Sequence, residues 1–130
     1  MKTRLAFVLA VLLAASLACD TSSTGGATEK DLSGTYVVSG TNFGDNTDSY
    51  TGEATIAKVS GNDYSVIWTI GESQTQTGSG TLSGNTFTVT WKEGDISGGG
   101  TYTLQSDGSL DGIWTVDGVD GQGTETFTPK

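Results

Sequence analysis

The acidic side chains, the tryptophans and a single cysteine are the residues whose chemistry could give this chain a function. Its 130 residues include 15 Asp and Glu, three Trp and one Cys, but no His. The chain therefore lacks the commonest general base and transition-metal ligand, and one Cys cannot form a zinc cluster. It contains no Gly-x-Ser-x-Gly motif, and nothing distinguishes two of its acids as the carboxylate pair of a glycosidase. We expect a protein that is not an enzyme and that uses no cofactor.

Two acidic segments offer oxygen ligands of the kind that Ca²⁺ prefers. They are Asp45-Asn46-x-Asp48 and Asp117-x-x-Asp120. Neither spacing matches a calcium-binding loop, so we expect no metal site. The charge balance excludes another class of partner, because 6 Lys and Arg stand against 15 Asp and Glu, for a formal net charge of −9. Proteins bind nucleic-acid backbones through Lys and Arg, so the sequence argues against a nucleic-acid partner.

The first 18 residues have the pattern of a signal peptide. Lys2 and Arg4 precede an apolar run from Leu5 to Leu17, which is too short to cross a bilayer. The junction Ala15-Ser16-Leu17-Ala18-Cys19 resembles the bacterial lipoprotein signal, in which the cysteine becomes the lipidated first residue of the mature chain. This resemblance implies a membrane anchor through a lipid on Cys19 and a place in the bacterial cell envelope, facing the periplasm or the exterior. A free exported thiol is the alternative.

Residues 19–31 form a predicted flexible tether, because after Cys19 the segment has no bulky apolar residue to bury. From residue 32 to 130, apolar side chains alternate with polar ones at a period of two, as in Tyr64-x-Val66-x-Trp68. This alternation is typical of half-buried antiparallel strands, and Gly, Asn and Asp turn signals recur about every 12 residues. The pattern predicts an all-β domain with strands near 34–41, 50–59, 63–70, 74–82, 86–92, 100–105, 109–116 and 123–128.

Eight short strands joined by tight turns favour an antiparallel up-and-down barrel of the calycin or avidin type, which leaves no exposed sheet edge. A two-sheet sandwich is the alternative. A barrel of eight strands either fills with side chains or holds one small ligand. The functional question is therefore whether the interior is full.

The inward face of such a barrel would combine large aromatic rings with Gly and Gln. Rings opposite glycines would leave a cup with a few polar groups. The predicted ligand-binding residues of this cup are Trp68, Gln76, Trp91, Tyr102, Trp114 and Glu125. The alternative is a dry core in which the glycines only make room for the rings. Glu125 also has a structural role available, because the 117–123 turn places it almost opposite Trp114, whose indole N–H needs an acceptor when buried.

A family resemblance rests on the segments Gly34-Thr35-Tyr36-Val37-Val38-Ser39-Gly40-Thr41, Tyr50-Thr51-Gly52, Gly108-Ser109-Leu110-x-Gly112-x-Trp114 and Gly123-Thr124-Glu125-Thr126. These segments look like a family of small exported bacterial β-barrel proteins. Members are mostly uncharacterised, and some carry a fibronectin-binding label. The resemblance covers nearly the whole domain.

A more distant resemblance links Gly78-Ser79-Gly80-Thr81, Thr88-Val89-Thr90-Trp91-Lys92 and Glu125-Thr126-Phe127-Thr128 to late strands of the avidin-like barrels. It implies that Trp91 and Trp114 are aromatic walls of a ligand cup and that Glu125 is its acidic acceptor. The polar ligand contacts of that family are replaced here by Val38, Ala54 and Ile56, so we do not expect biotin binding.

Together these observations predict an exported, lipid-anchored protein whose barrel binds a small apolar or amphipathic ligand without catalysis. The alternative is a protein-interaction or adhesion module with a filled barrel and an extracellular protein partner. In that case Phe43 and Tyr50, which flank the first loop, would provide the docking surface.

Overall fold

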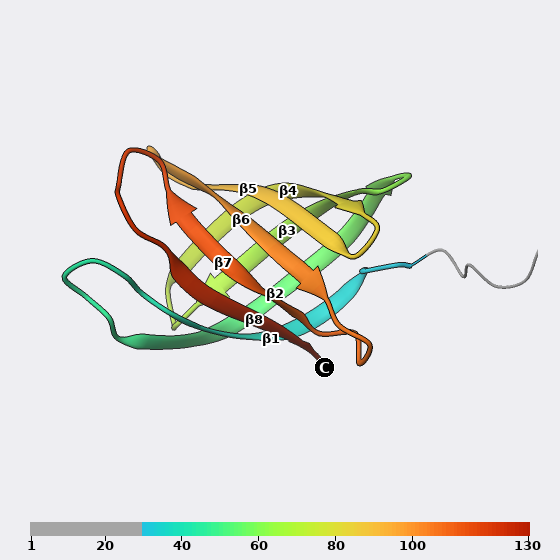
Figure 1. Cartoon of the computed structure of the whole chain (residues 1–130), viewed down its shortest axis with the longest axis horizontal. Helices are drawn as coiled ribbons and strands as arrows, with labels where there is room; N and C mark the ends of the chain where they lie inside the picture. The colour runs from blue at the N-terminus through green and yellow to red at the C-terminus, as the bar shows by residue number, and fades with distance from the viewer. Residues whose placement is uncertain (1–29) are drawn as a thin grey trace, which may run out of the picture. The chain divides into compact units, whose positions relative to one another are not determined.

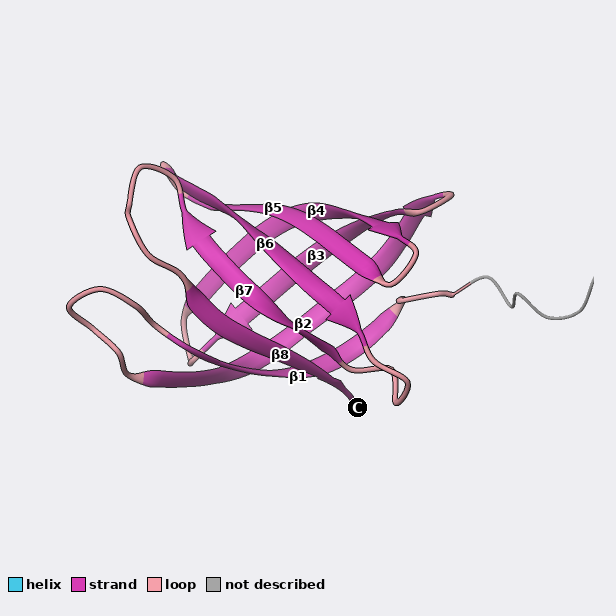
Figure 2. Cartoon of the chain, in the orientation of Figure 1, coloured by secondary structure: helices cyan, strands magenta, loops and turns pink. Residues whose placement is uncertain are grey.

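The computed structural model describes residues 30–130, and residues 34–129 of these form one closed barrel of eight antiparallel strands (Figures 1 and 2). The strands are β1 (Gly34–Thr41), β2 (Ser49–Ser60), β3 (Asp63–Ile70), β4 (Gln74–Ser83), β5 (Thr86–Glu93), β6 (Ile96–Leu104), β7 (Leu110–Val116) and β8 (Gly123–Pro129). The predicted signal peptide, Cys19 and the tether up to residue 29 lie outside the described residues. Within residues 30–130 there is no helix that could span a membrane.

Each strand pairs with its successor, and β1 pairs with β8 to close the sheet, with Val38 opposite Phe127. This closure confirms the predicted up-and-down barrel and excludes the two-sheet sandwich. All eight predicted strands are present, and the largest difference is at β6, which begins at Ile96 rather than at residue 100. Its first half includes Gly98 to Gly100 and shows no alternation, so only pairing with β5 and β7 reveals it as a strand.

The eight-strand meander places its connections at two ends. The four connections 42–48, 71–73, 94–95 and 117–122 lie at one end, which we call the mouth. The turns 61–62 and 84–85, the connection 105–109 and the C-terminus lie at the opposite end. Gly61 and Gly84 adopt φ values of +52° and +60° there, which L side chains rarely adopt, and they allow tight turns between successive strands.

The half of the barrel away from the mouth is filled by a dry core. Tyr64 and Phe87 meet edge to face at 5.8 Å, and Tyr102 and Phe127 do so at 5.0 Å. The Tyr36 hydroxyl donates to the Leu32 carbonyl at 2.7 Å, so its polar atom is satisfied. The alternation therefore predicted the buried face correctly, and the core closes this end of the barrel. Over the whole barrel, the largest fully buried side chains are Val38, Ile56, Tyr64, Val66, Trp68, Phe87, Val89, Tyr102, Leu110 and Phe127.

Candidate functional site

A buried carboxylate lies in the barrel interior on the mouth side of the dry core. Glu125 of β8 is 6% exposed. Its two neighbours across the sheet are glycines, Gly40 of β1 and Gly112 of β7. Beyond them, Tyr50 of β2 pairs with Gly40, and Tyr102 of β6 pairs with Gly112. The register therefore forms the row Tyr–Gly–Glu–Gly–Tyr, in which the missing side chains of the two glycines let both tyrosines reach the carboxylate.

Three neutral donors converge on Glu125. The Tyr50 hydroxyl donates to Oε2 at 2.6 Å, and the Tyr102 hydroxyl donates to Oε1 at 2.8 Å. The Trp68 indole Nε1–H donates to Oε1 at 3.2 Å. An indole N–H can only donate, so Glu125 must act as an acceptor. Oε1 then accepts two hydrogen bonds and Oε2 accepts one.

Burial and hydrogen bonding act in opposite directions on the pKa of Glu125. Burial raises this pKa, and the three donors partly offset the shift. Burial and the neighbouring carboxylate raise the pKa values of Tyr50 and Tyr102, so both hydroxyls stay protonated and continue to donate. The site is thus a desolvated carboxylate held by neutral partners.

A cavity of about 110 Å³ lies between this carboxylate and the mouth of the barrel. All six residues predicted from the sequence line it, and the structure therefore brings the whole predicted cup together. Tyr50, Ile70, Asn42 and Gln74 complete the lining. The ten lining residues are Asn42, Tyr50, Trp68, Ile70, Gln74, Gln76, Trp91, Tyr102, Trp114 and Glu125.

The aromatic wall of the cavity is continuous with the first loop of the mouth. Trp91 and Trp114 meet at 6.1 Å, and Tyr50 and Trp114 meet at 6.2 Å, both edge to face. Phe43, in the β1–β2 connection, packs against Trp114 at 5.0 Å. Phe43 is therefore part of the wall around the mouth.

Two expectations about these aromatic residues are wrong. The indole that donates to Glu125 belongs to Trp68, whereas Trp114 donates to the Thr41 carbonyl at 3.2 Å. The reason is the register, because Gly123 rather than Glu125 stands opposite Trp114, and the indole lies over that glycine toward β1. Tyr50 is not a loop residue available for docking, since it lies on β2 and its hydroxyl is held by Glu125.

The sequence contained a signal for Tyr50 as a site residue. Tyr50, Gly52, Ala54 and Ile56 share one parity, and Ala54 and Ile56 are fully buried. Extending that parity to the start of β2 places Tyr50 inside the barrel. Ile70 carried the same signal, because it continues the parity of Tyr64, Val66 and Trp68 to the end of β3. Asn42 carried none, because it lies just beyond the end of β1, where the alternation stops.

The polar rim of the cavity is partly organised by β5. Gln74 Nε2 donates to Glu93 Oε2 at 2.7 Å, and Gln76 Nε2 donates to the same oxygen at 3.3 Å. This contact orients two amides of β4 at the entrance. It also places a second carboxylate near the cavity, in addition to Glu125.

These features define an eight-stranded up-and-down barrel with a dry core at one end and an aromatic cavity at the other. Solved structures of redesigned β-barrels are similar to it. The match to b11L5F_LGL covers 76% of this chain and 91% of that one, with a TM-score of 0.62 and 23% identity. The match to mFAP1 bound to DFHBI covers 75% and 94%, with a TM-score of 0.62 and 23% identity.

A further match, to mFAP0 bound to DFHBI, covers 75% of this chain and 97% of that one, with a TM-score of 0.61 and 24% identity. At these identities the likeness shows the barrel fold alone. The chain matches no protein-family model and has no significant match among curated protein sequences.

Proposed function

We propose that this protein is a non-catalytic binding protein whose barrel holds a small apolar or amphipathic ligand at its mouth. The observation that carries the proposal is the cavity, whose walls include three tryptophans and two tyrosines around one buried carboxylate. Small-molecule sites have this composition: a concave, mostly aromatic lining with a few fixed polar groups.

The size of the cavity limits what enters it. Its volume of about 110 Å³ is close to that of engineered apolar cavities of roughly 150 Å³ that take up benzene. It is smaller than the roughly 300–1,000 Å³ of sites that enclose drug-sized ligands. A group of about the size of one ring therefore fits inside, and the rest of a larger ligand would extend through the mouth.

Similar barrels add support. The mFAP1 and mFAP0 structures each hold the small molecule DFHBI. The alternative of an adhesion module with a filled barrel has less support, because the barrel contains a cavity and Tyr50 points into it.

Export and anchoring complete the proposal. The signal-peptide pattern of residues 1–18 and the junction before Cys19 support cleavage at that point and lipidation of the cysteine in a bacterial cell envelope. Mass spectrometry of the mature protein from its own host tests this part, and an unmodified Cys19 thiol would refute the anchor.

Ligand binding is tested by native mass spectrometry of the same material, supported by tryptophan fluorescence titrations with small aromatic alcohols, amines and acids and with DFHBI. We expect a bound small molecule that is released on denaturation, or a saturable change in emission. Gln76→Phe should weaken binding about tenfold or more, because the larger side chain enters a cavity with little spare volume.

Thr77→Phe is the matched control, because Thr77 is the next residue on β4 and is exposed on the outside of the barrel. It should leave binding unchanged. The proposal fails if the native protein carries no ligand and none of these compounds gives a saturable change. It also fails if both variants weaken binding equally.

A further inference from the structure

The cavity concentrates aromatic rings of the kind that attract cations. All three tryptophans of the chain line it, together with Tyr50 and Tyr102. The faces of Trp and Tyr rings attract organic cations electrostatically, most strongly in a desolvated site. An aromatic lining also suits neutral ligands, so the charges around the cavity must decide between the two.

The one acidic side chain among the lining residues, Glu125, has no cationic partner among them. Glu125 accepts hydrogen bonds from two hydroxyls and one indole, all of them neutral. None of the ten lining residues is Lys or Arg. A buried carboxylate without a counter-charge is costly, and a bound cation would offset that cost. Oε2 accepts only one hydrogen bond, so it keeps acceptor capacity for a ligand N–H.

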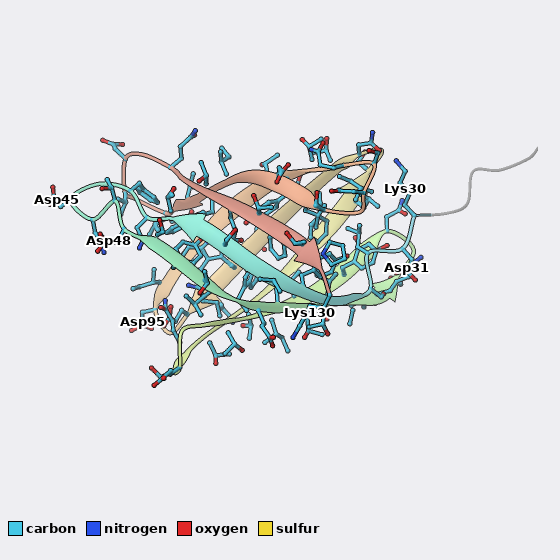
Figure 3. All side chains as sticks on the ribbon, turned by 90° about the horizontal axis from the view of Figure 1, so that it is seen from below. Lys30, Asp31, Asp45, Asp48, Asp95 and Lys130 are labelled. Atoms are coloured by element: carbon cyan, nitrogen blue, oxygen red, sulfur yellow. The ribbon has the colours of Figure 1, made fainter. Side chains whose placement is uncertain are left out.

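The mouth carries the same sign of charge. Its four connections contain no Lys or Arg, and their acidic residues are Asp45, Asp48, Glu72, Asp95, Asp117 and Asp120, all exposed. Figure 3 shows Asp45, Asp48 and Asp95 at this end of the barrel, away from Lys30 and Lys130. Glu93 adds a carboxylate beside Gln74 and Gln76 at the rim. Such a field raises the local concentration of cations and repels anions.

From these three observations we propose that the cavity binds a small organic cation, an alkylammonium or quaternary ammonium group, between the aromatic rings and above the Glu125 carboxylate. This inference rests on the proposed ligand-binding function and specifies its ligand class. The volume of about 110 Å³ suits the cationic head group, with any longer substituent directed out of the mouth.

The test compares two probes of nearly the same shape, choline and its neutral isostere 3,3-dimethyl-1-butanol. Binding is followed by tryptophan fluorescence, which reports on this cavity because every tryptophan lines it. We expect choline to bind about tenfold or more tightly than the neutral alcohol. Glu125→Gln should reduce choline affinity by a similar factor, so that the preference for choline over the alcohol is lost.

The amide of Glu125→Gln can keep all three contacts, since its oxygen can accept from Trp68 and Tyr102 and its nitrogen can donate to Tyr50. Asp111→Asn is the control for net charge, because Asp111 is exposed on the outside of β7. It should not change choline binding.

Equal affinities for the two probes, or unchanged choline binding in Glu125→Gln, would overturn the cation assignment. So would binding of neutral or acidic aromatic compounds alone. In each of these cases a compound can still bind in the cavity. If Gln76→Phe weakens the binding of that compound, the proposed function is still supported. If no compound binds, both proposals fail.

Discussion

Replacing Glu125 with leucine is expected to destabilise the barrel by about 3 kcal/mol or more, because three buried donors would lose their acceptor at once. The Tyr50 and Tyr102 hydroxyls and the Trp68 indole N–H all point at this carboxylate. Leucine has a similar volume but no polar atom, so packing is nearly preserved while the hydrogen bonds are lost. The free energy of unfolding in urea, followed by tryptophan fluorescence, measures the effect.

Glu125→Gln is the matched variant, and its stability should lie within about 1 kcal/mol of the native protein, because the amide can satisfy all three partners. If the leucine variant unfolded at the same urea concentration as the native protein, the three hydrogen bonds would contribute no net stability.

The native protein and Glu125→Gln, compared at different pH values, report on the titration of Glu125. Burial raises its pKa in the folded state above the ordinary value of 4.5, so the folded protein holds this proton more tightly than the unfolded chain. Relative to Glu125→Gln, the native protein should therefore lose stability as pH rises from about 4.5 through the raised pKa, and then level off. Parallel stability curves for the two proteins would contradict a raised pKa.

The second large effect is expected at Gly112, where alanine should destabilise the barrel by about 3 kcal/mol. A Cβ at this position would overlap the Thr101 carbonyl oxygen and lie 2.7 Å from Cα and Cδ1 of Tyr102. Two of these atoms belong to the backbone of β6, so a side-chain rotation cannot relieve the clash. Tyr102 would also be displaced from Glu125. Urea unfolding again provides the measurement.

Gly99→Ala on the adjacent strand β6 is the control for this prediction. A Cβ there meets nothing closer than the Val89 carbonyl oxygen at 3.4 Å, which is ordinary van der Waals contact. We expect a change of less than about 1 kcal/mol. A loss in Gly99→Ala as large as that in Gly112→Ala would indicate that the cost comes from the strand backbone in general and not from the close approach of β7 and β6.

The two predictions concern one feature, the lateral row from Tyr50 to Tyr102. In this row the glycines have a spatial function, because each leaves room for a tyrosine to reach Glu125 from two strands away. The row separates the dry core on one side from the cavity on the other. Stability and ligand binding are therefore linked through the same carboxylate.

The strands and the face that each of them buries follow from the local sequence pattern. Alternation at a period of two places Trp68, Trp91 and Glu125 on the inward side, and these residues do line the cavity. The sequence is sufficient here because successive side chains of an extended chain point to opposite faces, whichever strands pair with it. The start of β6 was missed because its glycines carry no such alternation.

Which inward residues meet depends on the tertiary structure. Closure of β1 on β8 sets the register of the barrel, and that register brings Trp68 rather than Trp114 to Glu125 and places the Tyr50 hydroxyl against the same carboxylate. The same register leaves the interior filled at one end of the barrel and hollow at the other. Contacts across a closed barrel depend on the stagger of all eight strands together, which no local pattern encodes.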